Sequence, residues 1–196
     1  FAAAGYLVRI SDLPVMDFSG LEDRPEVQIF RGDIGGKEAV SEAVAGVAAV
    51  VHLAALLPPR SKQDRAATMA VNVAGTRNIV DAMESETSGG KLVFASSVST
   101  YGDTTGDNPP ITPNHAQHAI DIYAESKIAA ESLIQESRLN SVILRIAPIA
   151  VPAFLEPPDV WPFTPSQRVE MVHRDDVVDA IYGAVRSEEA VGKALN

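Results

Sequence analysis

Tyr123 and Lys127 are side chains whose types and spacing suggest acid–base chemistry. They stand four residues apart in a segment, 120–137, whose sequence favours a helix, and residues at this spacing share one helix face. A free tyrosine has a pKa of about 10, so a tyrosine base near neutral pH needs a downward shift of roughly three units, or about 4 kcal/mol. A nearby lysine cation and a positively charged cofactor would favour that shift. The same spacing is common on solvated helix faces, so the pair alone does not identify a site.

A pair of serines upstream strengthens the case for a site. The segment from Lys91 to Gly102 reads KLVFASSVSTYG, and its apolar part, 91–95, is typical of a strand. Ser96 and Ser97 follow at the end of that strand. Each could also be an ordinary hydroxyl at a strand end.

The elements that must position these residues alternate along the chain. Ala48 to Leu53 is a continuous apolar run, which is typical of a parallel strand buried on both faces. Strands that alternate with helices in this way predict an α/β fold, a doubly wound parallel sheet. We expect strands at 6–10, 27–30, 48–53, 91–95, 141–146 and 169–172, helices at 37–45, 63–86, 120–137 and 175–186, and irregular segments at 103–118 and 148–165.

Polar and small residues gather where the expected strands end. In doubly wound sheets, ligands bind beyond the carboxyl ends of the strands. The residues expected at this edge are Asp12, Asp33, Ala54, Ala55, Ser96 and Ser97. Such regular placement favours a binding site over scattered core positions.

Composition narrows the class of protein. The 196 residues suffice for one domain with a core, and 46% hydrophobic and 21% charged residues are ordinary values for globular proteins. A net charge of −10 argues against a nucleic-acid partner. The chain has no cysteine and four histidines without metal-binding spacing, so no metal is expected. No apolar run reaches the roughly 18 residues of a membrane span, and no signal peptide is visible, so a cytoplasmic protein without a membrane partner is expected.

Motifs over nearly the whole chain together resemble one family. Their order and spacing are similar to those of the extended short-chain dehydrogenase/reductase (SDR) family, and in particular to its NAD-dependent epimerase/dehydratase group. The motifs are VRISDLP, FRGDI, VVHLAA, NVAGTRNIVDAM, LVFASSVSTYG, YAESK, LRIAP and VEMVHRDDVVDAI. The resemblance implies a Rossmann-type NAD-binding domain over residues 1–196, with short substrate-binding elements around residues 148–170.

The resemblance also implies roles for individual residues. Tyr123 would be the general acid/base, Lys127 would bind the nicotinamide ribose and lower the pKa of the tyrosine, and Ser97 would bind the substrate oxygen, with Ser96 as the neighbouring candidate. Asp12 would bind the adenosine ribose, and its carboxylate would repel a 2′-phosphate, which favours NAD over NADP. The remaining residues implied to contact the cofactor are Leu13, Asp33, Ile34, Leu53, Ala54, Ala55, Asn72, Ala95, Pro148 and Ile149.

Several of these residues have structural alternatives. Asp12 and Asp33 could be turn residues, and Asn72 more simply bonds backbone inside the fold. His52 is more simply a packed core residue. Arg145 could be structural or could reach a substrate phosphate.

The sequence departs from the family pattern at its start. The first strand and the Gly-rich turn, which cradles the pyrophosphate in the family, are absent. The first strand is central in the family's strand order, so we expect the natural chain to be longer at both ends.

The resemblance predicts an NAD-dependent enzyme of the epimerase/dehydratase or dehydrogenase type. Hydride would pass between nicotinamide and a carbinol or ketone carbon, with a nucleotide-sugar as the expected small-molecule substrate. One alternative is an NAD(P)H-dependent reductase of a small ketone or aldehyde, and another is a non-catalytic dinucleotide sensor or pseudoenzyme. A homodimer through the helices at 63–86 and 120–137 is a further expectation from the resemblance.

Overall fold

The computed structural model describes residues 1–86, 89–150 and 168–196. Strands and helices alternate along these residues, as the sequence predicts. The elements are η1 (Ala2–Ala4), β1 (Val8–Asp12), β2 (Val27–Arg31), α1 (Lys37–Val44), β3 (Ala49–His52), α2 (Arg60–Gln63), α3 (Arg65–Met69), η2 (Ala70–Ala74), α4 (Gly75–Ser85), β4 (Lys91–Ser97), η3 (Val98–Tyr101), α5 (Ile122–Gln135), β5 (Asn140–Ile146), β6 (Ile149–Ala150), β7 (Val172–His173), α6 (Arg174–Arg186) and β8 (Lys193–Leu195).

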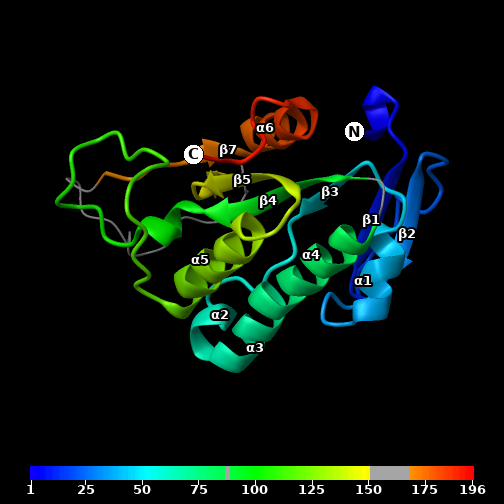
Figure 1. Ribbon diagram of the computed structural model, residues 1–196, viewed down its shortest axis with the longest axis horizontal. Helices are drawn as coiled ribbons and strands as arrows, with labels where there is room; N and C mark the ends of the chain where they lie inside the picture. The colour runs from blue at the N-terminus through cyan, green and yellow to red at the C-terminus, as the bar shows by residue number, and fades with distance from the viewer. Residues whose placement is uncertain (87–88, 151–167) are drawn as a thin grey trace.

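The strands are parallel and form three groups. β3, β4, β5 and β8 make a four-stranded sheet in that order, β1 pairs with β2, and β6 pairs with β7. Helices α1, α4 and α5 lie on one side of the strands and α6 on the other (Figure 1). The predicted α/β architecture is confirmed.

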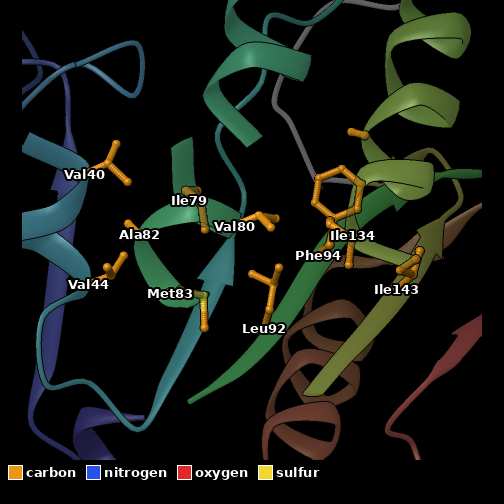
Figure 2. Packing of buried hydrophobic residues seen from close by; sticks show 11 residues of the cluster. Val40, Val44, Ile79, Val80, Ala82, Met83, Leu92, Phe94, Ile134 and Ile143 are labelled. Carbon is orange, nitrogen blue, oxygen red and sulfur yellow. The ribbon is translucent and has the colours of Figure 1, made fainter. Parts of the chain in front are cut away.

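Strand β4 shows why the central strands are apolar throughout. Leu92 and Phe94 are buried against α4 and α5 on one face, whereas Val93 is buried toward α6 on the other (Figure 2). A strand covered by helices on both faces has no solvent-exposed side to carry alternate polar residues. This burial fixes β4, and therefore Ser96 and Ser97 at its end.

The pairing of β1 with β2 leaves them apart from the main sheet. Within the described residues, neither strand is hydrogen-bonded to β3. Helix α1 connects the two parts, because Val40 and Val44 share a buried cluster with Ile79 and Met83 of α4.

The expected helix over 63–86 begins at Arg65 and runs without interruption through α3, the π-helical turn η2 and α4 to Ser85, and the short helix α2 precedes it. Asp64 separates α2 from α3, and its carboxylate accepts a hydrogen bond from the Ala67 N–H (2.9 Å) as the N-cap of α3. Strand β1 also ends two residues later than expected, so Asp12 is its last residue.

The expected substrate-binding elements around 148–170 fall mostly outside the described residues. Of the described helices, none is both long and apolar enough to cross a membrane.

Candidate active site

Ser97 and Tyr123 meet at the carboxyl end of β4. Ser97 is the last residue of β4, and its Oγ accepts a hydrogen bond from the Ser99 N–H (3.2 Å) at the start of η3. Tyr123 is the second residue of α5, whose N-cap Asp121 accepts from the Ala124 N–H at 2.8 Å. The half-buried phenol of Tyr123 lies close enough to the Ser97 side chain for this hydroxyl to lower the tyrosine pKa. The structure therefore brings together the two groups assigned to proton transfer and substrate binding.

The pKa of Tyr123 lies above its usual value. Burial raises it, the Ser97 hydroxyl lowers it, and the nearby carboxylate of Asp121 raises it. Lys127 Nζ lies 5.9 Å from the centroid of the Tyr123 ring, and the lowering of the tyrosine pKa by Lys127 stays a prediction.

Lys127 is almost fully buried one turn further along α5. Its Nζ donates a hydrogen bond to the Ala95 carbonyl of β4 (2.7 Å) and lies 4.6 Å from the centroid of the Phe94 ring. Burial lowers the pKa of Lys127 to about 8, partly offset by the carboxylate of Glu131. A lysine with this pKa is only partly protonated at mildly alkaline pH.

The two carboxylates that were expected to bind the cofactor, Asp12 and Asp33, lie at or just after the ends of the paired strands β1 and β2. Each accepts a hydrogen bond from a backbone N–H close to it in the chain. Asp12 is exposed at the end of β1, and its Oδ1 accepts from the Leu13 N–H at 2.7 Å. Asp33 follows β2, and its Oδ1 accepts from the Gly35 N–H at 2.8 Å, which is a turn interaction. These bonds fit the turn alternative, and a ribose role for either carboxylate remains a prediction.

Asn72 holds the segment that follows β3. Its Oδ1 accepts from the Leu56 N–H (2.6 Å), while its Nδ2 donates to the Leu56 carbonyl (3.2 Å) and to Ser126 Oγ of α5 (2.9 Å). The backbone alternative therefore describes Asn72 in this structure. Its effect is to fix the course of the segment that contains the exposed Leu53 and Ala54 and the half-buried Ala55.

The other residues that were expected near the cofactor lie at the same edge. The Ile34 carbonyl accepts a hydrogen bond from Asn78 Nδ2 (2.9 Å). The Ile34 side chain packs against Gly75 so closely that a Cβ on this glycine would lie 2.9 Å from Ile34 Cγ2. Pro148 and Ile149 follow β5 and are exposed. These positions are compatible with contacts to a ligand beyond the strand ends, which stay predictions.

His52 and Arg145 are structural. His52 is buried in β3, its Nε2 lies 2.9 Å from Thr76 Oγ1, and burial lowers its pKa to about 3, so it stays neutral. Arg145 is 5% exposed, and its guanidinium donates to Glu131 and Tyr101 of the same protein. It is therefore not free to reach a substrate phosphate.

Two residues near the site were missed from the sequence. Glu131 is buried on α5 four residues after Lys127, and this spacing from Tyr123 and Lys127 was the available signal. Arg31 is in register with Asp12, is ion-paired with Glu22 and lies over the ring of Phe18 (4.6 Å from its centroid). The sequence alone does not predict that Arg31 lies beside Asp12, because this depends on how β1 and β2 are aligned in the sheet.

Metal chemistry receives no support from the described part of the chain. Among those residues, no three His, Asp or Glu side chains gather in a way that could hold a metal ion.

Comparison with protein families identifies the class. The model of the NAD dependent epimerase/dehydratase family matches residues 7–153. The chain therefore belongs to the NAD-dependent epimerase/dehydratase family, as the motifs predicted.

The chain is also similar in sequence to individual curated proteins. It is 31% identical over 67% of its length to the human sterol-4-alpha-carboxylate 3-dehydrogenase, decarboxylating, and covers 34% of that protein. It is 38% identical over 54% of its length to the N-acetyl-alpha-D-glucosaminyl-diphospho-ditrans,octacis-undecaprenol 4-epimerase of Escherichia coli O157:H7, and covers 30% of it. The chain thus spans about a third of the length of these curated relatives.

A solved structure supports the same class. A short-chain dehydrogenase/reductase superfamily protein from Agrobacterium tumefaciens with bound NAD superimposes with a TM-score of 0.63 at 30% identity, over 76% of this chain and 44% of that one.

Proposed function

We propose that this protein is an NAD-dependent enzyme of the epimerase/dehydratase type that acts at a carbinol or ketone carbon of a nucleotide-sugar. The observation that carries the proposal is the convergence of Ser97, Tyr123 and Lys127 at the carboxyl end of β4. A hydroxyl pair with a buried amine beside it is the set of groups needed to move one proton at a substrate oxygen.

The residues present fit a dinucleotide with a nicotinamide ring. An exposed carboxylate, Asp12, ends β1, the exposed Leu53 and Ala54 follow β3, and the buried ammonium of Lys127 lies under the end of β4. In doubly wound sheets this edge receives the ligand, and a strand-end acid binds the ribose hydroxyls. When bound, NAD would supply the hydride acceptor and donor.

Each side chain then has a defined task. As a phenolate, Tyr123 would take the proton from a substrate hydroxyl while hydride passes from the carbon that bears this hydroxyl to NAD, and it would return the proton to the oxygen when the ketone is reduced. Ser97 would donate a hydrogen bond to that oxygen and hold it at the phenol. Lys127 would bind ribose hydroxyls and, as a cation, stabilise the phenolate of Tyr123.

The names of relatives support the substrate class. Besides the epimerase from Escherichia coli, a GDP-6-deoxy-D-mannose reductase from Pseudomonas aeruginosa is 36% identical over 43% of this chain. The name of the reductase describes a nucleotide-sugar, and that of the epimerase describes a sugar linked through a diphosphate to undecaprenol.

The test is turnover of a panel of UDP- and GDP-hexoses by the full-length protein with NAD. The proposal predicts conversion of at least one sugar with a catalytic amount of NAD and no net change in the NAD pool. Stoichiometric loss of NADH with a small ketone or aldehyde would instead indicate a reductase. Absence of any conversion, in a protein that binds NADH, would overturn the proposal in favour of a dinucleotide sensor.

A further inference from the structure

A buried ion pair lies directly behind the proposed catalytic residues. Glu131 of α5 is 1% exposed and Arg145 of β5 is 5% exposed. Arg145 Nη2 donates to Glu131 Oε2 (2.7 Å), and Nε contacts both carboxylate oxygens at 3.1 and 3.2 Å. A buried ion pair contributes little net stability, because desolvation offsets much of the attraction, so a positioning role is a reasonable explanation for this one.

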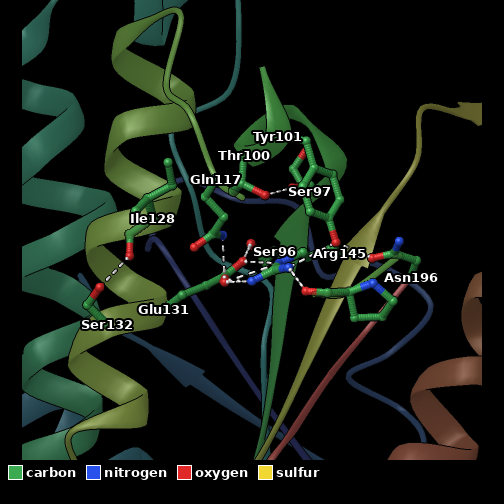
Figure 3. A network of polar contacts seen from close by, with 11 residues as sticks. Ser96, Ser97, Thr100, Tyr101, Gln117, Ile128, Glu131, Ser132, Arg145 and Asn196 are labelled. Carbon is green, nitrogen blue, oxygen red and sulfur yellow. Dashed lines mark hydrogen bonds and ion pairs between the residues drawn. The ribbon is translucent and has the colours of Figure 1, made fainter. Parts of the chain in front are cut away.

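The pair connects the two elements that carry the catalytic groups. Glu131 accepts a hydrogen bond from Ser96 Oγ, the neighbour of Ser97 on β4. Glu131 also lies on the face of α5 that carries Tyr123 and Lys127, because the three residues follow at intervals of four. Figure 3 shows Glu131 reaching from α5 to Arg145 and Ser96. The carboxylate thus fixes the helix of Tyr123 against the strand of Ser97.

The same pair holds the connecting segment 103–121, which joins η3 to α5. Arg145 Nη1 donates to the Pro113 carbonyl at 2.8 Å and to the Tyr101 hydroxyl at 2.9 Å. Gln117 Nε2 donates to Glu131 Oε2 at 2.9 Å. Because this segment ends at Asp121, the N-cap of α5, its anchoring also fixes the first turn of the helix that contains Tyr123.

The contacts extend to β8 and its end. The Tyr101 hydroxyl donates to Asn196 Oδ1 (2.6 Å), and Asn196 Nδ2 donates to the Ile111 carbonyl (2.8 Å). Figure 3 shows Tyr101 and Asn196 on the side of Arg145 away from Glu131. The pair is therefore the centre of a buried network that joins β4, α5, β5, the connecting segment and the residue after β8.

We propose that Glu131 and Arg145 are positioning residues that hold α5 against β4 and so keep the Tyr123 phenol beside the Ser97 hydroxyl. The inference rests on the proposed function, in which Tyr123 and Ser97 act on one substrate oxygen. Neither residue of the pair touches that oxygen. Their effect on catalysis passes through the geometry of α5 and β4.

The test follows the titration of Tyr123 without any substrate. The full-length protein is labelled with 3-fluorotyrosine, whose phenol is more acidic than that of tyrosine and so titrates at a less alkaline pH. The sequence has four tyrosines, so the ¹⁹F NMR resonance of Tyr123 must be assigned. It is the resonance that disappears in Tyr123→Phe. Ser97→Ala calibrates the experiment, because it removes the hydroxyl that lowers the pKa of Tyr123.

Two variants disturb the network with little change in charge. Arg145→Lys keeps the positive charge but loses the planar fork that reaches Tyr101 and Pro113. Ser96→Ala removes only the hydroxyl that joins β4 to Glu131 and, as a small deletion, keeps the proposal testable should Arg145→Lys not fold. Arg65→Lys is the control. Arg65 of α3 forms an exposed ion pair with Glu125 of α5, the helix that also carries Tyr123.

The proposal predicts that the Tyr123 pKa rises in both network variants in the direction of Ser97→Ala, by roughly half a unit to one unit, the equivalent of one hydrogen bond. NADH affinity and the titration in Arg65→Lys stay unchanged. A folded Ser96→Ala or Arg145→Lys protein with the wild-type titration would overturn it, as would a Ser97→Ala protein without a shift. Failure of the proposed function is seen separately, as sugar conversion that persists in Tyr123→Phe.

Discussion

At the scale of single residues, the site combines a tyrosine that resists ionisation with a lysine that gives up its proton easily. The pKa of Tyr123 is raised mainly by burial, and that of Lys127 is lowered to about 8 by burial. Both shifts favour the neutral forms, as expected for groups taken out of water. A nearby positive charge on a bound cofactor would favour the tyrosine anion, so the acid–base function depends on the ligand as well as on the chain.

The depressed pKa of Lys127 predicts a pH-dependent stability. Between the folded pKa of about 8 and the usual lysine value of 10.5, the unfolded chain binds a proton that the folded chain has released, so this group makes the free energy of unfolding rise with pH. The full effect is on the order of 3 kcal/mol. Chemical denaturation of wild type and Lys127→Met from pH 7.5 to 10.5 should show wild type gaining stability relative to the variant. A difference that is flat across this range would contradict the burial of a charged lysine.

The proposed role of Asp12 leads to a prediction about the choice between NADH and NADPH. In its proposed role the Asp12 carboxylate binds the ribose and repels a 2′-phosphate, and Asp12→Ser would remove both effects. The Kd of NADH should therefore rise about tenfold, the equivalent of one charge-assisted hydrogen bond, while that of NADPH stays level or falls. Fluorescence titration measures both constants. Asp17→Ser, at an exposed position further along the same segment, should leave them unchanged, and an equal loss for both cofactors would speak against the ribose role.

At the scale of elements, the π-helical turn η2 is the least ordinary feature near the site. π-helical turns within longer helices are rare and often occur at functional sites. Here the turn carries Asn72, whose amide is bonded to the backbone of Leu56 and to Ser126 of α5. The irregular turn thus ties the segment after β3 to the helix that holds Tyr123 and Lys127.

Asn72→Ala tests this arrangement. The substitution leaves the Leu56 N–H without its partner, so the free energy of unfolding should fall by about 2 kcal/mol. NADH binding should weaken as well, because Leu53 and Ala54 lose their anchor. Chemical denaturation and NADH titration measure the two effects, with Asn140→Ala at the exposed start of β5 as the control. A stability equal to that of the control variant would refute the anchoring role.

Sequence patterns predicted the central strands because burial on both faces leaves a continuous apolar run. The continuous apolar runs at β3 and β4 are examples, and the serines at the end of β4 follow from the strand boundary. The break between α2 and α3 at Asp64 and the π-helical turn η2 were not predicted, since residues 60–69 contain no proline and no glycine. An N-cap interaction and a π-helical turn depend on backbone geometry that residue types alone do not specify.

The buried network was also beyond sequence reasoning. Glu131 lies on a helix among other charged residues, and a glutamate in that setting is normally solvated. Its burial depends on Arg145, which is in register with Ser96 on the neighbouring strand. Such a pairing is known only once the sheet order and register are known.

At the scale of the whole molecule, the central strands of the main sheet have more hydrogen-bonded neighbours and more helix packing than β1 and β2. β4 is flanked by β3 and β5 and covered by helices on both faces, whereas β1 and β2 pair only with each other among the described strands. Isolated two-stranded units are marginally stable. The link through α1 and α4 is thus the main support for β1 and β2.

Hydrogen exchange should reveal this division. In the 196-residue chain, amides of β4 and β5 are expected to exchange by global unfolding and those of β1 and β2 by local opening, at least tenfold faster. Mass spectrometry of peptic peptides measures both groups in one experiment. Equal protection of the two groups would show that β1 and β2 unfold together with the main sheet.

The whole account depends on Tyr123 as the group that moves the proton, and the most direct test is Tyr123→Phe. Sugar conversion and NADH affinity are measured on the same preparations of wild type and variant. We expect conversion to fall by at least a hundredfold, in keeping with the usual contribution of a general acid/base, while the Kd of NADH changes less than about threefold. Undiminished conversion by a folded Tyr123→Phe protein would contradict the central claim.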